Sequence, residues 1–167
     1  MISSKNLILK PLSASQLLKY IANDNSLERE LKLNPTEKTI TSQIKEAIEE
    51  SILPNLSDSG KNHLFSTLWA IILKNESRMV GDICFVGEPD QEGEIELGYL
   101  TYEAYRGKGY MTEAIACILE WAKRQDFVKS VFAQTAKSNP ASYKILEKNN
   151  FVKVGEDEEV FNWRLNF

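Results

Sequence analysis

The chain has 167 residues, of which 43% are hydrophobic and 26% are charged, which is the balance of a single globular domain. Its formal net charge of −4 argues against a nucleic-acid partner, which usually meets a basic surface, and is compatible with a cationic or amine partner. No stretch approaches the ~20 apolar residues of a membrane span, so we expect no membrane partner.

Before residue 63 the sequence predicts one strand and three helical segments. They are a strand over 6–10 that Pro11 stops, a helix capped by Ser13, a helical region over 27–33, and a longer helix from about Ile40 that Pro54 ends. Residues 55–62 read as a polar loop. No motif of known chemistry lies in the helical insert over 26–62.

After residue 63 the pattern changes to strands. Three strands form a meander over 64–73, 79–86 and 94–102, followed by a helix over 110–124 and a strand over 130–134. Asn139 fits the N-cap of a last helix with Pro140 in its first position, and Asn150 fits a left-handed end. Strands over 151–154 and 160–167 complete an α+β domain with a mixed, mostly antiparallel central sheet flanked by helices.

The cysteines and the histidine exclude several kinds of chemistry. Cys84 and Cys117 lie in apolar runs with no disulfide framework, which indicates a reducing compartment, and no signal peptide precedes the first strand. We therefore expect a cytoplasmic protein. His63 is the only histidine and lies beside a polar loop, so a Ser-His-Asp hydrolase is disfavoured. No cluster of His, Cys and carboxylates has the spacing of metal ligands, so no metal is expected.

The turn over 106–109 (RGKG) joins the third strand of the meander directly to a helix. Glycines allow successive N–H groups to point at one place, and a helix start adds free donors and a positive dipole end. Such a turn predicts a site for pyrophosphate. The same four residues are equally consistent with a plain glycine turn that carries two solvated basic side chains. The spacing excludes a P-loop, a Rossmann fingerprint and a kinase glycine loop.

Two segments resemble the GNAT acyltransferase superfamily. Residues 106–110 match its motif A, [QR]-x-x-G-x-[GA], although Met111 stands where Gly or Ala is usual. Residues 139–151 are similar to the N-x-x-S…LEK-x-G-F segment of the ribosomal-protein N-acetyltransferase-like branch, with Asn150 in place of glycine. The resemblance covers about residues 69–151 and implies a GNAT-like fold in one domain over 1–167. The insert over 26–62 is expected to shape the acceptor site.

The resemblance implies acetyl-CoA as acyl donor. Backbone groups of residues 99–101 would pair with the pantetheine arm, and N–H groups of residues 107–111 would hold the pyrophosphate. The side chain of Asn139 would contact the arm. The implied donor-binding residues are Tyr99, Leu100, Thr101, Arg106, Gly107, Lys108, Gly109, Tyr110, Met111 and Asn139.

A general base and a general acid are expected for attack by an amine. Glu94 and Glu96 share one face of their strand, and Glu96 aligns with the glutamate that precedes the family's Gly-Tyr pair. We predict Glu96 as the base, with Glu94 or water as alternatives. Many members use a tyrosine of the last helix as acid, but Leu146 stands there. In the resembling branch a serine serves, and Ser142 matches it; Tyr143 is the alternative.

The predicted activity is therefore N-acetylation of a primary amine by direct attack on acetyl-CoA in a ternary complex. The acceptor is a protein N-terminus or a small amine, and the protein acts as a monomer or homodimer. Two other classes stay open at this point. One is a non-catalytic acyl-CoA-binding module of the same fold, and the other is a dinucleotide-binding protein.

Overall fold

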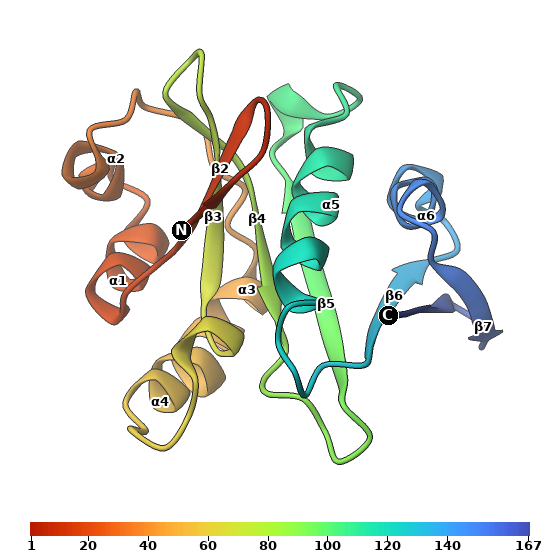
Figure 1. Cartoon of the computed structure of the whole chain (residues 1–167). Coiled ribbons are helices and arrows are strands. Elements are labelled where there is room, and N and C mark those ends of the chain that lie inside the picture. The colour runs from red at the N-terminus through yellow and green to blue at the C-terminus, as the bar shows by residue number, and fades with distance from the viewer.

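One eight-stranded sheet organises the chain, and the computed structural model describes all residues from Met1 to Phe167 (Figure 1). The strands in chain order are β1 (Ile2–Ser3), β2 (Leu7–Pro11), β3 (Leu68–Leu73), β4 (Arg78–Phe85), β5 (Glu94–Thr101), β6 (Ser130–Ala136), β7 (Val152–Glu156) and β8 (Val160–Asn166). Their order across the sheet is β1-β2-β3-β4-β5-β6-β8-β7, and every neighbouring pair is antiparallel except β5 and β6. The predicted fold class is confirmed.

Helices cover both faces of this sheet. They are α1 (Ala14–Ala22), α2 (Ser26–Leu31), α3 (Ser42–Ala47), the π-helix η1 (Ile48–Ile52), α4 (Leu53–Leu56), α5 (Tyr110–Ala122) and α6 (Pro140–Lys148), with short 3₁₀ turns η2 (His63–Phe65) and η3 (Glu103–Tyr105). Figure 1 shows α1 and α2 at one side of the molecule and α6, with β6 and β7, at the opposite side. None of the helices has both the length and the apolar composition to cross a membrane.

An aromatic cluster fixes α5 against the middle of the sheet. Trp121 of α5 lies 5.3 Å from Trp69 of β3 and 5.1 Å from Phe65, measured between ring centroids. Trp69 and Phe65 are fully buried. Large aromatic side chains bury much apolar area and gain further from tilted contacts, so this cluster sets how α5 lies on the sheet. The cluster anchors the C-terminal half of α5, and the start of the helix follows the end of β5 directly in the chain.

The parallel pair of β5 and β6 is short. Only Glu94, Ile95 and Glu96 pair with β6, opposite Ser130, Val131 and Phe132. Beyond Glu96, β5 continues to Thr101 and β6 to Ala136 without pairing with each other. The two strands therefore diverge, and an opening lies between them in the middle of the sheet.

Three expectations about local structure were wrong. The residues over 64–67 do not belong to a strand, because η2 occupies His63–Phe65 and β3 begins at Leu68. The sequence predicted no strand before residue 6, because β1 has only two residues and shows no alternating pattern. Pro54 does not end the helical segment, which continues through α4, so the polar loop begins after Leu56 rather than at residue 55.

The π-helix explains why Pro54 is tolerated. Proline has no N–H, and its ring clashes with the carbonyl one turn earlier in an α-helix. In η1 the turn is wider, and the N–H of Leu53 donates to the carbonyl of Ile48, five residues back. The wider turn accommodates Pro54 at the start of α4 without breaking the helical path.

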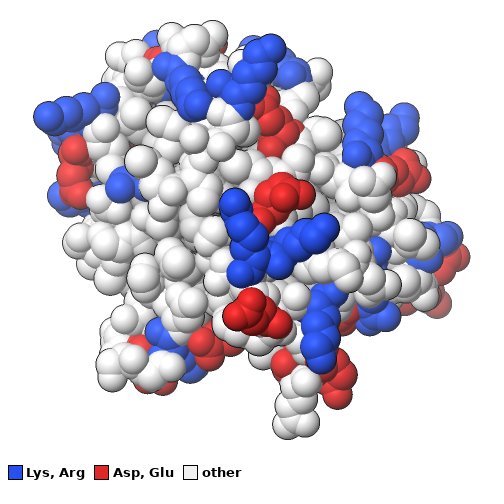
Figure 2. Space-filling view, in the orientation of Figure 1, with Lys and Arg blue, Asp and Glu red and all other residues white.

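Acidic and basic side chains are mixed over the surface. On the face shown in Figure 2, Lys and Arg alternate with Asp and Glu in small groups and do not form one continuous basic field. Such a field is the usual footprint of a nucleic-acid-binding protein. The face shown therefore offers no large patch of one sign.

A buried carboxylate connects α1 to β4. Asp82 is only 2% exposed, and the hydroxyl of Tyr20 donates to its Oδ2 over 2.7 Å. Burial raises the pKa of Asp82 to about 7, because a charged carboxylate is poorly solvated there. The folded state therefore keeps a proton on Asp82 at pH values where the unfolded chain, with an ordinary pKa of about 3.9, has lost it.

This proton gives a testable pH dependence of stability. Between about pH 4 and about pH 7 the folded state binds more protons than the unfolded state, so the contribution of Asp82 to stability falls as the pH rises. Asp82→Asn keeps an acceptor for Tyr20 and abolishes the titration. We expect the stability of this variant relative to wild type to increase between pH 5 and pH 8, measured by urea unfolding. Asp126→Asn, at an exposed position, is the control. Parallel pH–stability curves for D82N and wild type would contradict the prediction.

Candidate active site

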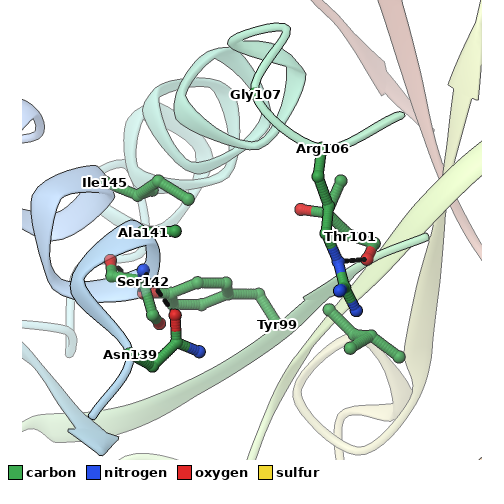
Figure 3. Close-up of a pocket in the computed structure, with 9 residues that line it drawn as sticks. Tyr99, Thr101, Arg106, Gly107, Asn139, Ala141, Ser142 and Ile145 are labelled. Carbon is green, nitrogen blue, oxygen red and sulfur yellow. Dashed lines mark hydrogen bonds between the residues drawn. The ribbon is translucent and has the colours of Figure 1, made fainter. Parts of the chain in front are cut away.

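A cavity of about 260 Å³ opens where β5 and β6 diverge. Its walls come from β5, from the turn after it and from α6: Tyr99, Leu100, Thr101, Arg106, Gly107, Asn139, Ala141, Ser142 and Ile145. Figure 3 shows Thr101, Arg106 and Gly107 on one side and the residues of α6 on the other. The structure thus brings both sequence segments together at one site.

The edge of β5 that faces the cavity has no partner strand. From Leu97 to Thr101, β5 pairs with β4 on one side only. Unpaired N–H and C=O groups along a strand edge can bind an extended polar chain in the manner of an added strand. Such an edge suits an extended chain with two amides, such as the pantetheine arm that the resemblance to the family implies at residues 99–101.

The turn at the end of β5 presents free backbone donors. None of the N–H groups from Gly107 to Thr112 donates to a protein acceptor. Gly107 has φ +72° and Gly109 has φ +82°, the left-handed conformation that favours glycine. The same segment begins α5, whose positive dipole end adds to the attraction for an anion. The turn has the properties of a phosphate site.

The basic side chains of the turn are held against the protein. The Nε of Arg106 donates to the carbonyl oxygen of Thr101 over 3.3 Å, which Figure 3 also shows. The Nζ of Lys108 lies 5.1 Å from the ring centroid of Tyr105. Both cations stay at the rim of the turn, where they add positive charge without filling it.

Met111 departs from the family pattern without blocking the turn. Met111 is 3% exposed, and the end of its side chain lies beside Gly81 of β4. A Cβ on Gly81 would lie 3.3 Å from the Met111 Cε and only 2.4 Å from the carbonyl oxygen of Leu100. Glycine at 81 makes room for the larger residue at 111, and the N–H groups remain open to the cavity.

A second cavity of about 210 Å³ continues the first over the turn. The two cavities share Thr101, Gly107, Ala141 and Ile145. Lys144 and Lys148 of α6 line the second one beside Gly109 and Tyr110. Sequence reasoning missed these two lysines, although their spacing of four residues on one helix face was a signal that could have indicated them. They extend the positive charge beyond the turn.

The start of α6 is built as the sequence predicts. The side chain of Asn139 accepts from the N–H of Ser142 over 3.2 Å, which confirms Asn139 as N-cap, and Pro140 follows it. At the other end Asn150 has φ +64° and takes the place of the usual glycine. Leu146 occupies the position where many family members have a tyrosine. Its apolar side chain is fully buried in the core and supplies no hydroxyl.

The hydroxyl of Ser142 lies in the cavity and contacts Tyr99. The Oη of Tyr99 is 3.0 Å from the Oγ of Ser142 and 3.0 Å from its backbone carbonyl oxygen. Tyr143 points elsewhere. Its ring packs at 5.6 Å from that of Phe161 and does not line the cavity. Among the two acids that the sequence leaves open, Ser142 is the one placed at the site.

The two glutamates of β5 have different surroundings. Glu94 accepts from the Nε and Nη2 of Arg164 over 2.5 and 3.0 Å, and from the Oγ of Ser130 over 3.0 Å. The carboxylate of Glu96 accepts no hydrogen bond and forms no ion pair, and its residue is half-buried at the point where β5 and β6 separate. The Glu94 carboxylate is therefore held by the ion pair, whereas the Glu96 carboxylate has no protein partner.

The insert over 26–62 does not line either cavity. Its interior holds an ion pair between Lys38 and Glu28, whose side chains are 0% and 1% exposed. A buried pair of this kind fixes the arrangement of α2 and the following loop. The expected role of the insert in shaping an acceptor site stays a prediction. No three His, Cys, Asp or Glu side chains are grouped as metal ligands would be.

A glycine turn with free N–H groups, an unpaired strand edge and the half-buried Ser142 hydroxyl thus meet at one site. The sequence profile described as "Acetyltransferase (GNAT) domain" matches residues 6–152. The chain belongs to this family, and the predicted class, an N-acetyltransferase, is confirmed at the level of the family.

Known proteins similar to the chain agree with this assignment. An uncharacterized N-acetyltransferase of Bacillus subtilis, YjdG, is 35% identical over 95 residues, which are 57% of this chain and 56% of the relative. A ribosomal-protein-S5-alanine acetyltransferase from Vibrio fischeri superposes with a TM-score of 0.71 at 19% identity, covering 98% of this chain and 94% of that one. Spermidine N-acetyltransferase from Vibrio cholerae, in complex with CoA and spermine, superposes with a TM-score of 0.67 at 15% identity, covering 98% of this chain and 96% of that one. The chain spans about half the length of its curated relative.

A pair of glycine variants tests the phosphate turn. Gly109 and Gly87 have φ of +82° and +88°, and a Cβ on either would touch nothing within 4 Å. Alanine at either position is therefore expected to cost about 1 kcal/mol of stability through backbone strain. Only Gly109→Ala disturbs the N–H groups of the turn, so we expect it to weaken CoA binding roughly tenfold, or about 1.4 kcal/mol, measured by calorimetry. Gly87→Ala, in the turn after β4, is the matched control. Equal CoA affinities in both variants would show that the turn does not bind the phosphates.

Proposed function

We propose that the protein is an N-acetyltransferase that moves an acetyl group from acetyl-CoA to a primary amine by direct attack in a ternary complex. One observation carries the proposal: the free N–H groups of residues 107–112 lie at one end of a continuous cavity that has the Ser142 hydroxyl at its other end.

The two ends of the cavity differ, so the site supports a single orientation of bound acetyl-CoA. The pyrophosphate fits the turn, and Lys144 and Lys148 stand beside the turn for the remaining phosphate. The unpaired edge of β5 is available to the pantetheine amides, and the Asn139 side chain lies at the same wall. This orientation brings the thioester to Ser142, near the point where β5 and β6 separate.

Glu96 is proposed as the general base. Successive side chains of a strand point to opposite faces, so Glu96 lies on the other face of β5 from Tyr99 and α6. A thioester between the diverging strands would be open to an amine from the Glu96 face and to Ser142 from the α6 face. The free carboxylate takes the proton of the attacking amine, directly or through a water molecule.

The cysteine nearest to Glu96 is unsuited to a covalent route. Burial, together with the charges of Asp82 and Glu96, raises the pKa of the Cys84 thiol to about 12. A thiol with that pKa stays protonated at neutral pH, and only the thiolate is a good nucleophile. This supports direct attack by the amine over an acyl-cysteine intermediate at Cys84.

The acceptor is proposed to be a protein N-terminal amine or a small amine. Deprotonation at pH 7 costs about 1.4 kcal/mol for an α-amine with a pKa near 8 and about 4.6 kcal/mol for a lysine-like amine near 10.4. A single carboxylate base is therefore more important for the second kind. Proteins of similar fold act on both kinds of acceptor. As their names state, the Vibrio fischeri enzyme acetylates a ribosomal protein, and the Vibrio cholerae enzyme was determined in complex with spermine.

The proposal is tested by thiol release from acetyl-CoA. We expect release in the presence of at least one member of a panel of small amines and of peptides that begin with Ser or Ala, and none without an acceptor. Mass spectrometry of the acceptor locates the acetyl group. CoA binding without acetylation of any acceptor favours the non-catalytic acyl-CoA-binding module. A melting temperature raised by NAD and not by CoA favours the dinucleotide-binding alternative.

Replacement of the base should act on rate in a pH-dependent way. Glu96→Gln is expected to lower kcat roughly 100-fold at pH 7, and less at high pH, where the amine is already deprotonated. Glu94→Gln loses the bidentate ion pair with Arg164, so its main effect should be on stability. The measurement is the pH profile of kcat for both variants beside their melting temperatures. A larger rate loss in E94Q than in E96Q would reverse the assignment.

Replacement of the acid should separate rate from donor binding. Ser142→Ala removes the proton donor for the leaving thiolate while the turn and the β5 edge remain, so kcat is expected to fall roughly 100-fold with little change in acetyl-CoA affinity. Steady-state kinetics and CoA calorimetry check the two quantities. Unchanged steady-state rates in S142A would show that another group, or water, protonates the thiolate.

A further inference from the structure

The side chain of Tyr99 crosses from β5 to α6 at the reactive end of the cavity. Figure 3 shows its ring extending toward Ser142, with the phenol hydroxyl at the serine. In the resemblance to the family only the backbone of Tyr99 has a part. The side chain is 43 positions away from Ser142 in sequence, and only the fold brings the two hydroxyls within 3.0 Å.

Tyr99 is the only side chain that forms a hydrogen bond with the Ser142 hydroxyl. The cap from Asn139 reaches the Ser142 N–H, not its Oγ. A serine hydroxyl without a partner can rotate among three staggered positions. Contact with a fixed phenol therefore decides where the serine proton points.

The phenol has one proton and two acceptors in reach. When it donates to the Ser142 carbonyl oxygen, the serine proton points back at Tyr99 and is not available to a leaving group. When it donates to the Oγ, the serine proton is released toward the cavity, and the Oγ–H bond becomes more polar. Burial raises the pKa of Tyr99 to about 12, so the phenol keeps its proton at neutral pH in either arrangement.

We infer that Tyr99 is a positioning residue of the transfer reaction: its phenol hydroxyl donates to the Ser142 Oγ and directs the serine proton at the leaving sulfur. The inference rests on the proposed function, in which Ser142 protonates the thiolate. Tyr99 need not touch the donor's sulfur or the acceptor. A purely structural tyrosine would be satisfied by the carbonyl bond alone, and its loss would change stability without changing kcat.

The test is a double-mutant cycle with Tyr99→Phe, Ser142→Ala and the combined variant. Y99F keeps the ring and removes the hydroxyl, so we expect kcat to fall roughly tenfold with KM for acetyl-CoA within about twofold of wild type. The double variant should be no slower than S142A, because Tyr99 acts only through the serine. A CoA-induced rise in melting temperature equal to that of wild type shows that Y99F is folded and binds the donor.

Tyr20→Phe is the matched control. It also removes a buried phenol hydroxyl, one that donates to Asp82 over 2.7 Å and lies outside the cavity. It should lower the melting temperature and leave kcat unchanged.

The outcomes separate the inference from the function on which it rests. Full activity in Y99F beside an impaired S142A overturns the role of Tyr99 and leaves that of Ser142. Rate losses that multiply in the double variant overturn it as well, since the two residues would then act independently. Full activity in S142A, or no transfer to any acceptor, overturns the proposed chemistry and the inference together.

Discussion

The separation of β5 and β6 after three paired residues is the constraint on which the site depends. It leaves the β5 edge unpaired from Leu97 onward, it puts Glu96 at the point of divergence, and it opens the cavity to α6. A sheet interior normally pairs every backbone group, because an unpaired buried donor or acceptor costs about as much as a lost hydrogen bond. Here those groups face a cavity that suits an extended amide-bearing ligand. The gap in the sheet therefore fits the binding role that we propose for it.

The rest of the fold holds this gap open at a fixed width. The aromatic cluster around Trp121 ties the C-terminal half of α5 to β3 and so fixes how the helix lies on the sheet. On the other wall, the Asn149 side chain donates to the Thr112 carbonyl oxygen over 3.3 Å and connects α6 to α5. The donor site is thus framed by rigid helices, which is what a reaction that depends on orientation requires.

Departures from the family pattern are compensated within the same structure. Met111 fits because Gly81 leaves room beneath it, and Asn150 adopts the left-handed conformation that glycine usually provides. Leu146 stands where the last helix usually has a tyrosine, and the hydroxyls present in the cavity are those of Ser142 and, from β5, of Tyr99. With these residues in place, the cavity and the free N–H groups of residues 107–112 are both present.

The sequence by itself determined the order of the elements other than β1, the glycine turn after β5, the Asn139 cap and the left-handed end at Asn150, because each depends on residues within a few positions of one another. The prediction failed at Pro54, because a π-helix accommodates the proline. It also failed at residues 64–67, because the buried Phe65 of a 3₁₀ turn gave that segment the apolar pattern of a strand. Only the tertiary structure decided that Glu94 is held by Arg164 while Glu96 is free, that Lys144 and Lys148 stand beside the turn, and that Tyr99 meets Ser142. The period of a strand predicts which face a side chain points to, but not where two strands stop pairing. That point depends on how α5 and α6 pack against the sheet, and it is set by contacts between residues far apart in the chain.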